Sequence, residues 1–166
     1  MRTIVVIAHD IRSTHNVGSL LRTCEGLGVS AMYLTGYTPY PSTTDDDRLP
    51  HIAQKLEGQI AKTALGAEKL IKWQYHENIK TLLTSLKHEG YEIAALEQII
   101  GAIKLPAYSP SSKLALLLGR EVEGIDSSLL ELCDTAIEIP MFGKKESFNV
   151  VQAAAMALYH FRFAPE

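Results

Sequence analysis

The sequence predicts an α/β fold with a parallel sheet, and two observations lead to this prediction. Short, continuous apolar runs, of which residues 4–8 are the first, are typical of strands that are buried on both faces of a parallel sheet. Stretches with apolar residues three and four positions apart, which are typical of amphipathic helices, stand between these runs. This alternation favours a single domain over residues 1–166, a length sufficient for one hydrophobic core.

The N-terminal elements follow this alternation in order. After the strand at residues 4–8, the polar residues 13–16 start a helix that stops at Gly28. Residues 31–34 are expected to form a short second strand. Residues 35–49 are rich in Pro, Ser, Thr and Asp and show no periodicity, so we expect a long loop there. Loops of that length are usually either functional or mobile.

The remaining elements continue the pattern to the C-terminus. Helical spacing of apolar residues and flanking cap residues predict further helices, and apolar or aromatic runs predict further strands. The expected helices cover residues 51–65, 78–89 and 149–163, with a short one starting near Asp126, and the expected strands cover residues 73–75, 91–96, 113–118 and 135–139.

The composition is that of an ordinary globular protein, with 46% hydrophobic and 21% charged residues. No apolar run approaches the roughly 18 residues that span a membrane, and the run at residues 4–8 is shorter than the core of a signal peptide. We therefore expect a cytoplasmic protein with no membrane partner. The formal net charge of −3 argues against non-specific binding of polyanions, so that any contact with RNA would come from a local basic patch.

The two cysteines, Cys24 and Cys133, each stand among apolar residues. This setting is typical of small core residues and not of a disulfide or a metal-binding pair. We expect no metal site.

A first pattern, N-x-G-x-x-x-R, is formed by Asn16, Gly18 and Arg22 directly after the first strand. Taken alone, it is also explained by a helix that Asn16 caps, in which Gly18 packs closely and Arg22 is a solvated charge. The functional interpretation rests on spacing, because Asn16 lies at a helix N-terminus, where N–H groups favour an anion. The long side chain of Arg22 points back toward that end, where a guanidinium can hold a phosphate or stabilise charge developing on an oxygen.

A second pattern, G-x-E-x-x-G, is formed by Gly119, Glu121 and Gly124 after the strand at residues 113–118. A plain strand-to-helix turn explains it equally well. No G-x-G-x-x-G follows the first strand and no Walker lysine pattern occurs, which disfavours nucleotide binding by those two routes. In the functional interpretation the glycines let the main chain approach a ligand closely, and Glu121 holds loop amides.

A third pattern begins with the apolar segment Ile-Pro-Met-Phe at residues 139–142, between the last strand and the C-terminal helix. Ser147 is explained as a cap of that helix, with Asn149 in its first turn, but the cap does not explain the apolar segment. An apolar wall with free backbone carbonyls suits adenine and a thioether or sulfonium, not a metal.

Together, and in this order along one domain, the three patterns resemble the motifs of the SpoU or TrmH branch of the SPOUT methyltransferases. The N-x-G-x-x-x-R pattern resembles the first family motif, LLLGREVEGI the second, and IPMFGKKESFNVVQAAAMALYHF the third. The resemblance covers nearly the whole chain. Two departures are small: Phe148 stands where the family usually has Leu, and Lys144 and Lys145 occupy a variable stretch.

The resemblance implies methylation of a ribose 2′-hydroxyl of RNA with S-adenosylmethionine as the cofactor. It also implies a Rossmann-like parallel sheet with a C-terminal trefoil knot, at about residues 93–163, that holds the cofactor. The implied catalytic residues are Asn16, Arg22, Glu121, Ser147 and Asn149. The implied cofactor-binding residues are Leu96, Gly119, Ile139, Met141, Ser147 and Phe148. RNA would be held by local positive charge at Arg12, Arg22, Arg48, Lys144 and Lys145.

The family resemblance further implies a homodimer, with the first and the C-terminal helices as candidate dimer surfaces. Because the chain starts directly at its first strand, a compact substrate such as tRNA is favoured, with rRNA as the alternative. A non-catalytic protein of the same fold that binds S-adenosylmethionine and RNA is a second hypothesis, and the full set of implied catalytic residues argues against it. A third hypothesis is methylation of a base nitrogen, which is disfavoured by the match to the ribose-directed branch.

Overall fold

Strands and helices alternate around one sheet over residues 2–165, which are the residues that the computed structural model describes. In chain order the elements are β1 (Thr3–His9), α1 (Thr14–Gly26), β2 (Ala31–Thr35), α2 (Pro50–Ala64), η1 (Ala67–Lys69), β3 (Trp73–His76), α3 (Ile79–His88), β4 (Glu92–Leu96), β5 (Ile103–Lys104), η2 (Leu105–Ala107), β6 (Lys113–Leu118), α4 (Ser127–Leu130), β7 (Thr135–Glu138) and α5 (Val150–Phe163).

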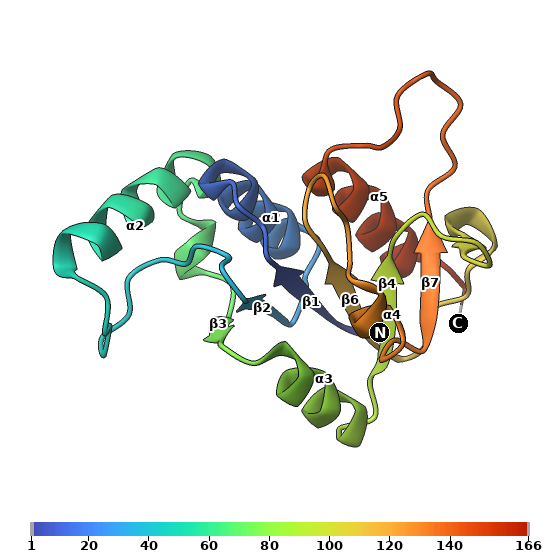
Figure 1. The fold of residues 1–166 in the computed structure, drawn as a ribbon, viewed down its shortest axis with the longest axis horizontal. Helices are drawn as coiled ribbons and strands as arrows, with labels where there is room; N and C mark the ends of the chain where they lie inside the picture. The colour runs from blue at the N-terminus through green and yellow to red at the C-terminus, as the bar shows by residue number, and fades with distance from the viewer. Residues whose placement is uncertain (1, 166) are drawn as a thin grey trace.

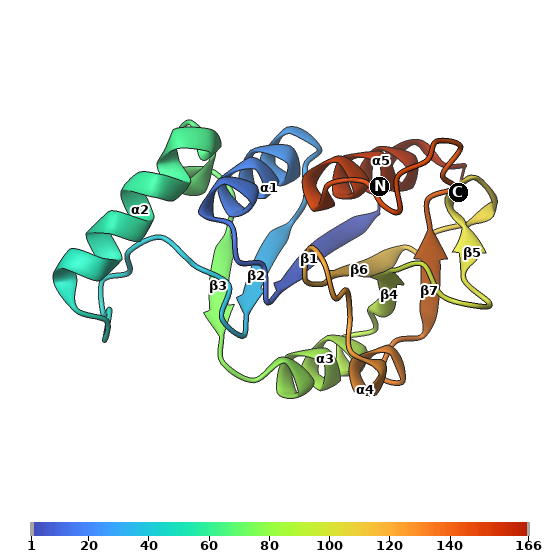
Figure 2. The same ribbon diagram turned by 45° about the horizontal axis from the view of Figure 1, so that its top comes forward.

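The seven strands lie in the order β3-β2-β1-β6-β4-β7-β5, and every adjoining pair is parallel. Val5 of β1 lies opposite Ala31 of β2, and Thr3 lies opposite Lys113 of β6. Helices α1, α2 and α5 cover one face of the sheet, and α3 and α4 cover the other (Figure 1, Figure 2). None of the helices within residues 2–165 has the length and apolar character needed to cross a bilayer. All strands end at the same edge of the sheet, where open α/β sheets bind their ligands.

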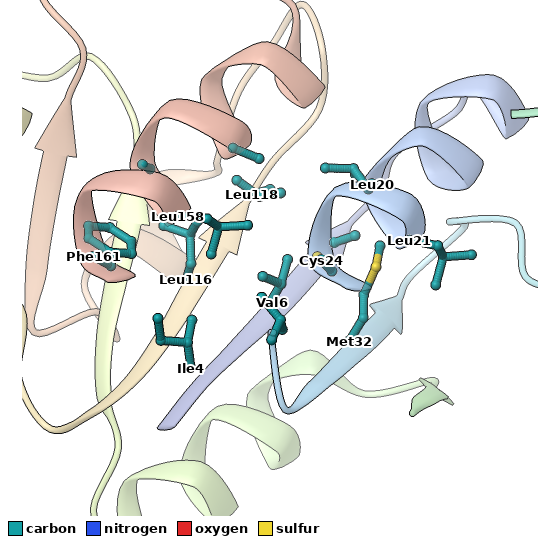
Figure 3. Packing of buried hydrophobic residues seen from close by; sticks show 14 of the residues in the cluster. Ile4, Val6, Leu20, Leu21, Cys24, Met32, Leu116, Leu118, Leu158 and Phe161 are labelled. Carbon is teal, nitrogen blue, oxygen red and sulfur yellow. The ribbon is translucent and has the colours of Figure 1, made fainter. Parts of the chain in front are cut away.

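The central strand β1 supplies side chains to both halves of the hydrophobic core. Ile4 and Val6 belong to a buried cluster that includes Phe161, under α1 and α5 (Figure 3). Val5 and Ile7 belong to a second cluster with the apolar residues of α3 and α4. Because alternate residues are buried on opposite faces, the strand is apolar throughout its middle, which is the pattern expected of a parallel strand.

The predicted parallel-sheet α/β class is confirmed, and the predicted elements lie within one or two residues of their observed bounds. The prediction missed β5 and the two 3₁₀ turns, η1 and η2. β5 has only two residues and both are exposed, so no periodicity could indicate it. The predicted trefoil knot stays a prediction.

Both cysteines are free. Cys24 is buried under α1, and burial raises the pKa of its thiol to about 12. Cys133 is partly buried, and burial raises its pKa to about 11. Both thiols are therefore protonated near neutral pH, as expected of small core residues.

Gly18 allows α1 and α2 to pack closely. A Cβ atom at this position would overlap the carbonyl oxygen of Ile60 and the hydroxyl of Thr63, both on α2. We expect Gly18→Ala to lower the free energy of unfolding, measured by chemical denaturation, by about 1–3 kcal/mol. Gly58→Ala on α2 is the matched control, because an added Cβ there would meet nothing within 4 Å; it should stabilise by about 0.5–1 kcal/mol. A stabilising Gly18→Ala would contradict this account of the helix contact.

Candidate functional site

A cavity opens at the carboxyl ends of β4, β6 and β7 and is closed on one side by the start of α5. Five of the six predicted cofactor-binding residues line it: Leu96, Gly119, Ile139, Ser147 and Phe148. The sixth, Met141, is not among the lining residues. The cavity volume is about 160 Å³, which is below the usual range for drug-sized ligands. A ligand of that size would therefore extend from the cavity into its open mouth.

The turn after β6 forms one wall of this cavity, and its two ends are joined by backbone hydrogen bonds. Arg120 and Gly124 exchange backbone N–H···O hydrogen bonds of 3.2 and 3.1 Å. Gly124 has a φ of 71°, in the left-handed region that favours glycine. Gly119 is required for a different reason, because a Cβ atom there would lie 2.8 Å from the carbonyl carbon of Gly124. Both glycines of the second pattern thus have a structural role in shaping the cavity wall.

Glu97, directly after β4, holds this turn in place by a hydrogen bond. Its carboxylate accepts hydrogen bonds from the backbone N–H of Ile125 at 2.8 Å and of Gln98 at 3.0 Å. A side chain on Gly124 would overlap this carboxylate. The sequence prediction missed Glu97 because it belongs to no motif. Its place directly after a buried strand, at the edge where ligands bind, was the available signal.

Glu121 joins the turn after β6 to the start of α1. Its carboxylate accepts hydrogen bonds from the Asn16 amide at 3.0 Å and from the backbone N–H groups of Arg12 and Ser13, both at 3.4 Å. Burial raises the pKa of Glu121, but these hydrogen bonds to the charged form outweigh burial and leave the pKa below its usual value. Glu121 is therefore a charged acceptor that fixes the position of Asn16.

Asn149, from the third pattern, is hydrogen-bonded to Asn16 and so joins Glu121 and Asn16 in one cluster. Its amide donates to the Asn16 side-chain oxygen at 3.3 Å, while its own oxygen accepts the N–H of Val151 at 2.9 Å and so caps α5. The structure corrects two cap positions. Ser13, and not Asn16, caps α1, and Asn149 caps α5 in place of Ser147. The first, second and third patterns therefore meet at one point on the rim of the cavity.

The lowered pKa of Glu121 predicts a pH dependence of stability. Because its folded-state pKa lies below the ordinary value of 4.5, the carboxylate stabilises the fold above about pH 4.5. This stabilisation is lost as the pH falls through the lowered pKa. Denaturation between pH 7 and pH 3 should show a steeper loss of unfolding free energy for the wild type than for Glu121→Gln. Parallel curves would show that the carboxylate is not held by these hydrogen bonds.

Arg22 stands apart from this cluster. It is exposed on α1, roughly 9 Å along the helix axis from Asn16, and it lines no part of the cavity. Within residues 2–165 its guanidinium has no hydrogen-bond or ion-pair partner. Ser147, by contrast, is exposed and lines the cavity. The structure of one chain does not bring Arg22 and Ser147 together.

Arg48 was predicted to bind RNA, but its guanidinium is occupied within its own loop. It donates to the Asp46 carboxylate at 2.7 Å and to the carbonyl oxygens of Tyr40 and Pro41 at 2.9 and 3.0 Å. The side chain of Arg48 is 16% exposed, and that of Asp46 is 11% exposed. These contacts indicate that Arg48 holds the loop between β2 and α2 together, and its RNA-binding role stays a prediction.

The other predicted RNA-binding residues are exposed. The side chain of Arg12 is 71% exposed and lies 3.9 Å from the carboxylate of Glu123 at the cavity mouth. Lys144 and Lys145 are exposed on the long segment that rises from β7 before it returns to α5 (Figure 1). These three side chains are therefore accessible to a ligand.

The charges around the cavity are predominantly negative. Four of the charged lining residues are glutamates and one is an arginine: Glu97, Glu121, Glu123, Glu138 and Arg120. Arg120 is paired with Asp126. The apolar strand ends and this excess of carboxylates suit a ligand with a flat apolar ring and a positive charge. Residues 2–165 contain no group of three or more His, Cys, Asp or Glu that could hold a metal ion.

A solved structure shares this fold, and two named relatives resemble the chain in sequence. A TrmH/SpoU tRNA-modifying enzyme of Aquifex aeolicus has the same fold, with a TM-score of 0.80 at 22% identity over 98% of this chain and 75% of that one. In sequence, a 23S rRNA guanosine 2′-O-methyltransferase of Bacillus subtilis is 28% identical over 95% of this chain and 57% of its own length. A tRNA guanosine 2′-O-methyltransferase of Aquifex aeolicus is 26% identical over 95% of this chain and 68% of its own length.

The chain thus spans between about half and two thirds of the length of these two relatives. The sequence model of the SpoU rRNA methylase family matches residues 3–159, which include all three patterns and every strand of the sheet. The chain therefore belongs to the SpoU rRNA methylase family.

Proposed function

We propose that this chain transfers a methyl group from S-adenosylmethionine to a ribose 2′-hydroxyl of RNA. The observation that carries the proposal is the hydrogen-bonded cluster of Asn16, Glu121 and Asn149 at the rim of the cavity. One residue of this cluster comes from each pattern that resembles a motif of ribose methyltransferases. The names of the two relatives, which describe ribose methylation of guanosine in rRNA and in tRNA, support the same reaction.

The cavity suits S-adenosylmethionine in shape and in charge. Leu96, Ile139 and Phe148 offer an apolar wall for adenine, and the surrounding carboxylates suit a cation. When bound, the cofactor supplies an electrophilic methyl group on a positively charged sulfur. The methyl group would pass to the ribose oxygen, and the proton of the hydroxyl would pass to a phosphate oxygen of the RNA.

The residues at the rim are placed to orient the reacting ribose. Asn16 and Asn149 would position the nucleotide through their amide groups, with Glu121 fixing Asn16. Such positioning supplies much of the rate in a displacement reaction. Ser147 would contact the cofactor at the cavity wall. Arg22 stays protonated, so we assign it to stabilising the developing alkoxide and not to accepting the proton.

We also propose that the chain works as a homodimer. Helix α5 exposes Met156, Tyr159 and Phe163 to 36%, 61% and 66%, and α1 lies beside α5 (Figure 2). Exposed apolar side chains of this size favour an interface. Because Arg22 lines no part of the cavity of its own chain, the dimer would supply it to the cavity of the second chain.

Among RNA substrates we place tRNA ahead of rRNA. The relative that this chain matches over the larger share of its length, 68% against 57%, is named as a tRNA enzyme. Ribose methylation of rRNA is the alternative. A non-catalytic protein that binds S-adenosylmethionine and RNA would not require the Asn16–Glu121–Asn149 cluster.

The test is transfer of labelled methyl from S-adenosylmethionine to separate tRNA and rRNA pools, taken from cells that lack this protein. Label in one pool, at a position that becomes resistant to alkaline cleavage, is the expected result and identifies the substrate class. Label at an alkali-sensitive position would point to base methylation. No label in either pool, with binding of S-adenosylmethionine demonstrated separately, would overturn the enzymatic proposal in favour of a non-catalytic binder.

A further inference from the structure

A second hollow lies on the same edge of the sheet, at the carboxyl ends of β2 and β3 and beside α2. Its volume is about 440 Å³, within the range of sites for small ligands. We call it the tyrosine groove, defined by Arg12, Tyr37, Tyr40, Arg48, Leu56 and Tyr75. Three of its side chains are tyrosines, and both of its charged side chains are arginines. Aromatic rings beside guanidinium groups are the usual surface for unpaired nucleotides.

The backbone beneath Tyr37 is held rigidly. Asp10 has a φ of 56°, a costly conformation for a residue other than glycine, and its carboxylate accepts the N–H of Tyr37 at 3.0 Å. The hydroxyl of Tyr75 donates to the carbonyl oxygen of Gly36 at 2.9 Å. Tyr37 as a whole residue is nevertheless 49% exposed. A fixed backbone that presents an open aromatic ring is a preorganised binding surface.

Tyr40 has a different role, because both faces of its ring are covered. Tyr75 stacks on it with ring centroids 4.3 Å apart and 22° between the planes, and the Arg48 guanidinium lies 3.6 Å from its centroid. Tyr40 and Arg48 therefore form a wall of the groove. Tyr37 and Arg12 remain as the exposed aromatic and the exposed cation, with the guanidinium 5.6 Å from the ring centroid.

Arg12 connects the tyrosine groove to the cofactor cavity. Its backbone N–H donates to Glu121 at 3.4 Å and its guanidinium lies 3.9 Å from Glu123, and both glutamates line the cavity. Thr14, which also lines the groove, stands in the same N-terminal turn of α1 as Asn16. A chain-like ligand whose reacting group lies at Asn16 would therefore have its next unit within reach of the groove.

From this arrangement we infer that the tyrosine groove binds an unpaired nucleotide adjacent to the one that is methylated, with its base stacked on Tyr37 and its phosphate on Arg12. This inference rests on the proposed function. Stacking on a tyrosine tolerates every base, so the groove selects substrates in which the neighbouring base is unpaired and does not specify that base. A cationic ligand is disfavoured because the exposed charged side chain of the groove is the Arg12 guanidinium, whereas Arg48 is paired with Asp46.

The test is direct titration of the tRNA and rRNA pools onto the full chain, with binding of S-adenosylmethionine measured on the same preparations. Tyr37→Ala should weaken RNA binding about 5- to 150-fold, the range given by loss of one stacked base, and should leave the affinity for S-adenosylmethionine within about twofold. Tyr37→Phe keeps the ring and should bind RNA like the wild type. Tyr91→Ala is the matched control, because Lys113 lies 5.5 Å from the Tyr91 ring at the opposite edge of the sheet.

The possible outcomes distinguish a failure of the RNA-binding inference from a failure of the proposed methyl transfer. Equal RNA affinity of the wild type and Tyr37→Ala would overturn the assignment of the tyrosine groove as an RNA-binding site, even if methyl transfer is observed. An equal loss of RNA affinity in Tyr37→Ala and Tyr91→Ala would also overturn it. RNA binding that depends on the Tyr37 ring, without any methyl transfer, would support the groove and overturn the enzymatic proposal. A wild-type chain that binds neither RNA pool would overturn both. Thermal melting of each variant identifies losses that come from unfolding.

Discussion

Arg22→Ala is expected to lower the rate of methyl transfer roughly 100- to 1,000-fold, the usual cost of removing one group that stabilises a developing oxyanion. The affinity for S-adenosylmethionine should stay within about twofold of the wild type, because Arg22 lines no part of the cavity. Turnover with the labelled cofactor and calorimetric titration of the cofactor measure the two quantities independently. A loss of rate without a loss of cofactor affinity is the result that assigns Arg22 to the transition state.

Two further variants test this assignment of Arg22. Arg22→Lys keeps the charge but loses the planar guanidinium, so it should recover only part of the rate. Lys80→Ala removes another exposed cation, from α3 on the opposite face of the sheet, and should leave the rate unchanged. The assignment would be wrong if Arg22→Ala lost cofactor affinity in parallel with turnover. It would also be wrong if Lys80→Ala lost as much rate as Arg22→Ala.

The order of elements could be predicted from the sequence because each strand carries its own local signal. The strand predicted at residues 113–118 coincides with β6, since the apolar run at residues 114–118 follows the polar residues 111–113 and ends at Gly119. The order of the strands in the sheet has no such local signal. That β6 lies between β1 and β4 depends on contacts between residues far apart in the chain.

The candidate site was predictable where its residues belong to motifs and not where they act through the fold. Asn16, Glu121 and Asn149 were selected from three separate patterns, and the structure joins them by hydrogen bonds. Glu97 was missed because its partner in the turn after β6, the N–H group of Ile125, becomes visible only when β4 and β6 are placed side by side.

Arg48 is the opposite case, in which a side chain that seems free in the sequence has partners in its own loop. Its position in a polar loop suggested a free cation for RNA. In the structure it is bound to Asp46, two residues earlier, and stacked on Tyr40. Composition cannot distinguish a free arginine from one that organises its own loop, because both occur among polar residues.

Gly119→Ala is expected to weaken binding of S-adenosylmethionine about 10- to 100-fold, the cost of forcing extra volume into a closely packed turn. The added Cβ would lie 2.8 and 2.9 Å from the carbonyl carbon and oxygen of Gly124, so the turn that walls the cavity would have to open. Calorimetric titration of the cofactor measures the effect. Gly143→Ala is the matched control, because an added Cβ there would meet nothing within 4 Å. Equal affinities of the two variants would show that the turn after β6 does not contact the cofactor.

The two defects, in Arg22→Ala and in Gly119→Ala, also test whether the site is shared between two chains. If Arg22 acts in the cavity of the second chain, a mixed dimer of the two variants holds one cavity with an intact Gly119 and an arginine supplied by its neighbour. Half of the randomly paired dimers are mixed, so co-expression should recover roughly one quarter of the wild-type activity. If Arg22 acts within its own chain, no chain in the mixture carries both residues. Activity as low as that of the separate variants would therefore contradict a shared site.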